Sequence, residues 1–271
     1  MIRKNFSTLL FTLLVSTVLI LGWLERDEYW YSAENGLGYA FGIIGSSMML
    51  LLLLYPARKY WKPMRHVFKV HHWFRLHMVF GVLGPVLILL HSNFSLGSLN
   101  SNIALFSMML VAGSGLIGRY VYQKLHRGLY GEQIAFSDLN NDYQTSKKHF
   151  IDSPFFTNNA HLLLDKIEEK LTQRGVSITT SLWARRKIKL IKRQSKKLLK
   201  ENTQKTDQIN QEQKQLLENY DTWISALNKL SKMANYALYA KLFSLWHIFH
   251  LPIFFMMIIT AIVHVFVVHM Y

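Results

Sequence analysis

One spacing between histidines occurs twice in this sequence. His77 and His91 are fourteen residues apart in one apolar run, and His250 and His264 are fourteen residues apart in the last apolar run. Fourteen residues at about 100° per residue bring a helical side chain back to within roughly 40° of its starting direction, with a rise of about 21 Å. Each helix therefore carries two imidazoles on one face, and two such helices facing each other would form two stacked histidine pairs.

Five apolar runs, at about residues 6–24, 37–55, 73–94, 103–122 and 242–268, indicate an integral membrane protein. Each run is close to the roughly 20 residues that a helix needs to cross a bilayer. The first run follows Arg3 and Lys4, as in a signal peptide. It is too long for a signal peptide and no cleavage site of small residues follows, so we predict a retained anchor.

The basic residues predict the orientation of the spans. Of the 31 lysines and arginines, only Arg26 lies on the side opposite to the N-terminus and the long loop. The positive-inside rule then places the N-terminus and this loop in the cytoplasm and the C-terminus outside. The third and fifth spans are then parallel. His77 would be level with His250 near the cytoplasm, and His91 with His264 near the outer face.

The chain is expected to have three parts: transmembrane helices 1–4 in residues 1–123, a basic helical insertion in residues 124–241, and transmembrane helix 5 in residues 242–271. Apolar residues at helical spacing and a basic amphipathic stretch at 182–200 predict a hairpin-like helical insertion. Its basic face is either a solvated or lipid-facing surface or a dock for an acidic redox partner. It has no phosphate-binding loop, so we expect no flavin or nicotinamide, and we expect no nucleic-acid partner.

Histidines inside a bilayer are uncommon and usually functional, and two facing imidazoles are the axial ligands that a planar haem iron takes. On the face of His77 and His91, Gly81 and Gly84 would leave room for a porphyrin, or would serve close helix packing. Arg75 and Arg119 are further candidates for haem contact; Arg119 would pair with a propionate or only mark the membrane interface.

Other sites are less well supported by the sequence. The G-x-G-x-x-G pattern at 113–118 lies inside an apolar helix and lacks the strand that a dinucleotide site needs. Without cysteine, the chain has no Cys-ligated cluster and no covalently attached haem. The two histidine levels are about 21 Å apart, so no single zinc could collect three of the four ligands. The histidines near span ends would line a quinone or metal site, bond propionates or be interfacial polar residues; they are His66, His71, His72, His247 and His269.

The four histidines and the order of the spans around them resemble the bis-haem b-type membrane cytochromes. Similar pairs occur in ferric-reductase-like transmembrane domains and in respiratory cytochrome b, and the resemblance covers about half of the chain. It implies an all-α membrane protein with five transmembrane helices, two stacked non-covalent b-type haems and a helical cytoplasmic insertion between helices 4 and 5. The haem iron ligands would be His77, His91, His250 and His264.

The expected function is electron transport across a bacterial-type inner membrane, between a cytoplasmic-side and an outer-side redox partner. The partner at either end would be a quinone, a metal ion or a redox protein. Two alternatives stay open at this point. One is a membrane quinone or ferric reductase with its own substrate site. The other is a non-redox protein of haem or metal transport or assembly.

Overall fold

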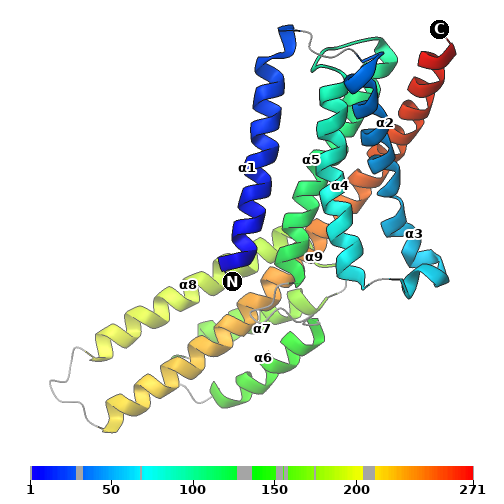
Figure 1. The fold of residues 1–271 in the computed structure, drawn as a ribbon. Helices are drawn as coiled ribbons and strands as arrows, with labels where there is room; N and C mark the ends of the chain where they lie inside the picture. The colour runs from blue at the N-terminus through cyan, green and yellow to red at the C-terminus, as the bar shows by residue number, and fades with distance from the viewer. Residues whose placement is uncertain are drawn as a thin grey trace. The chain divides into compact units, whose positions relative to one another are not determined.

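The computed structural model describes residues 2–28, 33–67, 69–126, 136–150, 155, 158–173, 175–203 and 211–270. All regular structure in these ranges is helical (Figure 1). The α-helices are α1 (Ile2–Leu24), α2 (Gly36–Leu51), α3 (Leu54–Tyr60), α4 (Val70–His91), α5 (Leu99–His126), α6 (Phe136–Phe150), α7 (Asn158–Thr172), α8 (Ile178–Thr203) and α9 (Gln211–Met270), with short 3₁₀ helices at Arg26–Glu28 and Lys62–Arg65.

Five of the described helical segments are long and apolar enough to cross a membrane, as the sequence predicts. They are Phe6–Leu24, Gly36–Arg58, Val70–His91, Leu99–Leu125 and Gln213–Met270. The last is longer than a span because the returning helix of the insertion and the fifth span form one continuous helix of 60 residues, α9. The predicted tip of the insertion hairpin includes residues 204–210, which lie outside the described residues.

The chain divides into two compact units. Unit 1 comprises residues 1–117 and 249–271, and unit 2 comprises residues 118–248. Both divisions fall inside helices, α5 and α9. The histidines at positions 77, 91, 250 and 264 all belong to unit 1, whereas Arg119 belongs to unit 2.

In unit 1, α2 and α4 pack closely because glycines face each other at their contact. A Cβ on Gly45 would lie 2.8 Å from the side chain of Ile88 and 3.1 Å from the carbonyl oxygen of Gly84. A Cβ on Gly84 would lie 2.9 Å from the sulfur of Met49. Small residues permit this approach of two helix backbones in a membrane.

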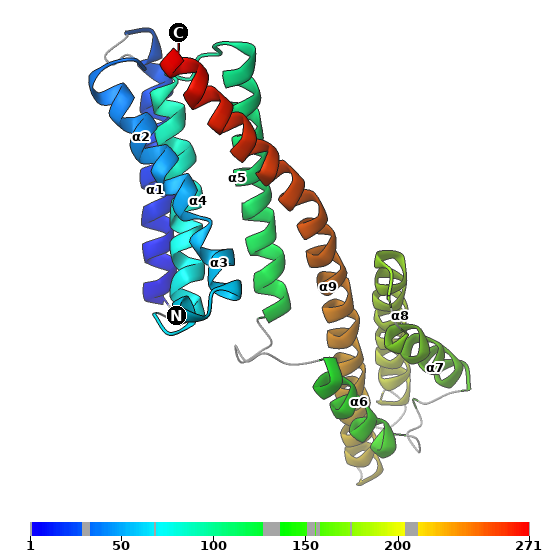
Figure 2. The same ribbon diagram turned by 90° about the vertical axis from the view of Figure 1, so that its right-hand side faces the viewer.

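Four helices contribute to the apolar interior of unit 1. Its buried cluster joins Met49 and Leu52 with Met108 and Val111 of α5 and Met257 of α9, and Phe80 of α4 packs against it. Figure 2 shows that α4 and the C-terminal part of α9 run in the same direction within this unit. The parallel arrangement of these two spans agrees with the charge pattern of the sequence.

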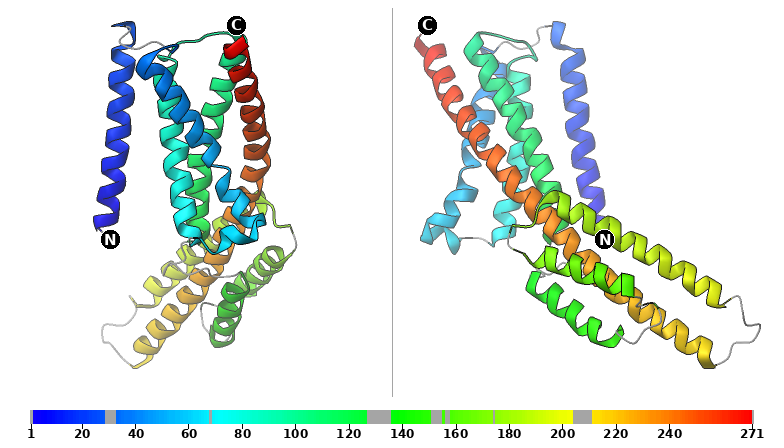
Figure 3. Two further views of the ribbon diagram at one scale, coloured as in Figure 1. Left: turned by 45° about the vertical axis from the view of Figure 1, so that its right-hand side comes forward. Right: turned by 180° about the vertical axis from the view of Figure 1, so that it is seen from behind.

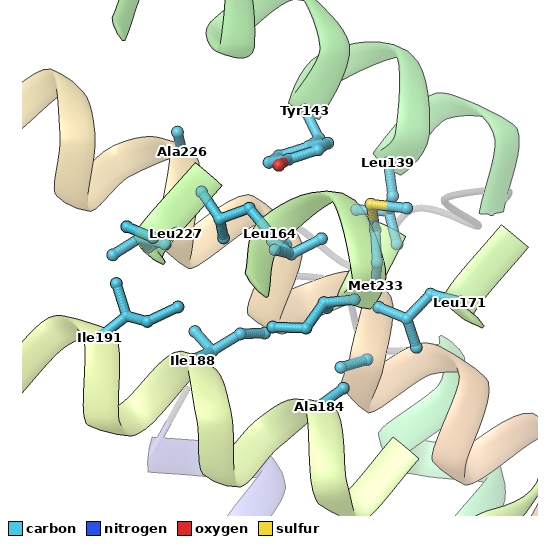
Figure 4. Packing of buried hydrophobic residues seen from close by; sticks show 14 of the residues in the cluster. Leu139, Tyr143, Leu164, Leu171, Ala184, Ile188, Ile191, Ala226, Leu227 and Met233 are labelled. Carbon is cyan, nitrogen blue, oxygen red and sulfur yellow. The ribbon is translucent and has the colours of Figure 1, made fainter. Parts of the chain in front are cut away.

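Unit 2 has a core of the kind found in water-soluble helical proteins. Figure 4 shows side chains of α6, α7, α8 and α9 that converge, among them Leu164, Ile188 and Leu227, each 1% exposed. Lys147 of α6 bridges Asp165 and Glu168 of α7 at 2.7 and 2.8 Å. Between α7 and α8, Gly175 has φ +80°, a left-handed conformation that glycine adopts without strain.

Candidate functional site

His77 lies on α4 with its ring held from the second span. Its Nδ1 is 3.3 Å from the carbonyl oxygen of Leu52, and its ring centroid is 5.2 Å from that of Tyr55. A carbonyl oxygen can only accept a hydrogen bond, so Nδ1 carries the ring hydrogen and is the donor. The lone pair of this neutral imidazole is then on Nε2.

His91, the last residue of α4, is held in the same way by α2. Its Nδ1 donates to the carbonyl oxygen of Gly38 over 2.9 Å. Gly42, one turn further along α2, lies against the ring: a Cβ there would come within 2.8 Å of Nδ1. The absence of a side chain at Gly42 therefore lets His91 reach the α2 backbone.

His250 of α9 is linked to α5 through a serine. The hydroxyl of Ser114 donates to the carbonyl oxygen of Val111 at 2.8 Å, and this uses its one hydrogen. The contact of 2.6 Å between Ser114 Oγ and His250 Nδ1 is therefore a bond that the histidine donates. The proton of His250 is thus assigned to Nδ1, as for the two histidines of α4.

His264 lies two turns beyond the buried residue Met257, on the side of α9 that faces the interior of unit 1. His250, Phe254, Met257 and His264 are all partly or fully buried, whereas residues 261–263 and 265–270 are exposed. His264 and His91 are close enough to interact electrostatically. These are the two histidines that the sequence pairs near the outer face.

This arrangement matches the donor chemistry of an imidazole that binds a metal. A metal-ligating histidine almost always donates its second ring N–H to a carbonyl, carboxylate or water, which fixes the tautomer and the ring orientation. His77, His91 and His250 each have such an acceptor on Nδ1, so these residues would fit a role as ligands of haem iron through Nε2.

The two candidate glycines have different surroundings. Apart from the backbone of its own helix and its chain neighbours, no described atom lies within 4 Å of a Cβ built on Gly81, four residues after His77. This open space is what a porphyrin edge would require. Gly84 instead packs against α2, which agrees with the alternative role of close helix packing. Arg75 is exposed on α4 and Arg119 is partly buried on α5.

Three of the other histidines gather near α3 and the start of α4 in unit 1. Around α3 and the start of α4 an open hollow of about 950 Å³ is lined by Arg58, His66, Val67, Lys69, Val70, His71 and His72. On α9, His247 and His269 donate from Nδ1 to the carbonyl oxygens of Phe243 and Val265, one turn back. Among the described residues no group of three His, Asp or Glu could hold a metal ion. A haem iron needs only two imidazoles from the protein, so this finding does not concern a haem site.

Sequence reasoning missed the groups that hold the histidines. The carbonyl oxygens of Gly38 and Leu52 have no sequence signal, because every residue has one. Ser114 had a usable signal: it is one of the two serines in the fourth apolar run, where a hydroxyl needs a partner.

Comparison with known proteins adds no relative. Neither the protein-family models, nor the curated proteins, nor the solved structures give a match to this chain. The assignment of a function therefore depends on the four histidines, their hydrogen bonds and the helices that carry them.

Proposed function

We propose that this protein is a membrane cytochrome b that carries electrons across a bacterial inner membrane through two non-covalent b-type haems. His77 and His250 hold one haem on the cytoplasmic side, and His91 and His264 hold the other on the outer side. Bound haem supplies one-electron chemistry, because its iron cycles between the ferrous and ferric states. The protein is then an oxidoreductase component of electron transport.

One observation carries this proposal. Three intramembrane histidines have Nδ1 committed to a hydrogen bond, two of them to backbone carbonyl oxygens of another segment. A histidine that served only helix packing would gain the same bond. Packing alone, however, does not account for two histidines on each of two parallel helices at the same fourteen-residue interval.

The residues around the histidines have two roles in the proposed transfer. The carbonyl oxygens of Leu52 and Gly38 and the hydroxyl of Ser114 fix the imidazole planes and their tautomers. The buried apolar cluster that contains Met49, Met108 and Met257 would keep water out of the interior of unit 1. A rise of about 21 Å between the levels spans most of the hydrocarbon core.

The electron donor and acceptor are proposed by class. A quinone, a metal ion or a redox protein would exchange electrons at either face. The basic surface of α8 is a docking site for an acidic cytosolic partner in this proposal, since complementary charge speeds the encounter of two redox proteins.

A second candidate function is a quinone or ferric reductase with its own substrate site. The hollow at Arg58, His66 and His72 favours it. Imidazole and guanidinium groups can donate hydrogen bonds to quinone oxygens or to the carboxylates of a ferric chelate. In this case the hollow would be the cytoplasmic-side site, and His66 and His72 would contact the substrate.

Purification with a visible spectrum and a haem count tests the proposal. We expect two b haems per chain, both low-spin with two imidazole ligands. One haem per chain, or zinc in place of iron in a metal analysis, would overturn the two-haem proposal. Loss of quinone or ferric reduction in His66→Ala and His72→Ala, with both haems retained, would favour the second candidate.

A further inference from the structure

A basic groove runs along the α8–α9 hairpin of unit 2. Figure 3 shows α8 beside the N-terminal half of α9, and Lys192 and Trp223 join the two helices by hydrogen bonds to Asn228 and Ser195. The groove has a volume of about 410 Å³. It is lined by Leu182, Arg185, Arg186, Ile188, Lys189 and Lys192 of α8 and by Ser231 and Asn235 of α9.

The charge of this groove is one-sided. Four of its lining residues are cations and none is a carboxylate. Across the described residues, the only ion pair made by a side chain of α8 joins Lys197 to Glu201, outside the groove. Arg185, Lys189 and Lys192 recur at the four- and three-residue steps that place side chains on one face, where like charges repel. An anion would remove this repulsion.

Of two further polar groups in the groove, one adds to this argument. Lys192 is partly buried, and desolvation lowers the pKa of its ammonium group; an anion beside it would favour the charged form. Asn235 holds a buried amide oxygen that accepts no hydrogen bond in the described part of the chain. An anionic group in the groove would satisfy Lys192, whereas the amide oxygen of Asn235 is covered by protein atoms and stays out of its reach.

We propose that this groove binds a phosphate-bearing ligand, with Arg185, Arg186, Lys189 and Lys192 around the phosphate. Guanidinium groups bind phosphate oxygens in pairs and ammonium groups bind them as point charges. The ligand chemistry is that of a glycerol phosphate, either as a lipid headgroup or as a free phosphate ester. The proposal is independent of haem binding in unit 1.

The test compares two triple variants of the full-length protein in detergent. Arg185→Gln/Arg186→Gln/Lys189→Gln removes three charges from the groove. The control removes three charges from the rest of α8, at Arg193, Lys196 and Lys200. All six side chains are exposed, so both variants should fold, and both change the net charge equally.

Binding of glycerol 3-phosphate is measured by calorimetry, and binding of phosphatidylglycerol to delipidated protein by native mass spectrometry. The groove variant should bind at least about tenfold more weakly than the wild type, the effect of losing one charged hydrogen bond, and the control about as tightly as the wild type. Binding of the lipid alone identifies a headgroup site, and binding of both probes identifies a site for free phosphate esters.

A third variant, Asn235→Asp, keeps every cation and adds a carboxylate to the groove. It should weaken binding of the same probe. Equal weakening by the groove and control variants, or no binding of either probe to the wild type, would overturn the proposal.

Discussion

Leucine side chains are buried in the core of unit 2 but exposed on α1 of unit 1. In unit 2, Leu164 and Leu230 are at most 1% exposed, whereas in α1 of unit 1 Leu13 and Leu14 are 59% and 55% exposed. Water drives apolar side chains inward in unit 2. Lipid tails are as apolar as leucine, so burial in unit 1 brings no such gain and its helices associate through packing and hydrogen bonds.

The two units also differ in the hydrogen bonds of their buried polar side chains. In the core of unit 2 a buried hydroxyl, Ser195, only accepts the indole N–H of Trp223 over 2.7 Å and donates to its own helix. In unit 1 three inward imidazoles, those of His77, His91 and His250, are each hydrogen-bonded to another segment. A polar interior is costly in lipid and is kept where it serves a function, which supports the proposal that these three histidines belong to the functional site of unit 1.

The largest effect is expected from a core truncation in unit 2. Leu164→Ala should destabilise this unit by about 2–5 kcal/mol, because it removes buried methyl groups and leaves a cavity. Hydrogen exchange of α7 in the full-length protein measures the loss. Leu162→Ala, on the same helix at 67% exposure, is the control and should change little. Equal effects would contradict the assigned core.

Exposed leucines of the two units should also respond differently to a charge, because α1 is expected to face lipid and α7 to face water. Leu14→Arg should oppose insertion of the first span by about 3 kcal/mol, whereas Leu162→Arg should be nearly neutral although both leucines are exposed. The chain has no native cysteine, so labelling of a Glu25→Cys variant from the outer side reports insertion. Full labelling in the Leu14→Arg background would show that α1 does not lie in lipid.

Removal of a group that holds a histidine should have a moderate effect on haem binding. Ser114→Ala deletes the acceptor of His250 Nδ1 and should weaken binding of the haem proposed between His77 and His250 by about 10–100-fold. Haem transfer to apomyoglobin measures the change. Ser107→Ala is the matched control, since within the described residues Ser107 bonds only to the backbone of its own helix. Equal loss in both variants would exclude a specific role for Ser114.

The smallest effect concerns the alkaline stability of unit 2. Burial and the carboxylates of Glu168 and Asp165 raise the pKa of Tyr143. Burial alone would lower the pKa of Lys147, but its bonds to Asp165 and Glu168 raise it overall. Both folded pKa values exceed the unfolded ones, so stability is complete below about pH 10 and falls above it.

Thermal unfolding between pH 8 and 11 checks this expectation. Tyr143→Phe should reduce the loss of stability at alkaline pH, because the phenol can no longer ionise on unfolding. It should cost little at neutral pH, since the buried hydroxyl has no hydrogen-bond partner among the described residues. An unchanged alkaline loss in this variant would rule out Tyr143 as its source.

Much of this organisation was predictable because its physical causes are local in sequence. Hydropathy alone predicts the five spans, and the fourteen-residue interval predicts that His250 and His264 share the inward face of α9. The carbonyl oxygens that hold His77 and His91 were not predictable, since they depend on how α2 packs against α4. The groove beside Asn235 likewise requires the pairing of α8 with α9, which the sequence suggests only as a hairpin.

Haem loss in four single variants tests the central claim most directly. His77→Ala and His250→Ala should each remove one and the same haem, identified by its spectrum and midpoint potential. His91→Ala and His264→Ala should each remove the other haem, while the first remains. Loss of one haem in His77→Ala and of the other in His250→Ala would contradict the proposed pairing across the two parallel helices.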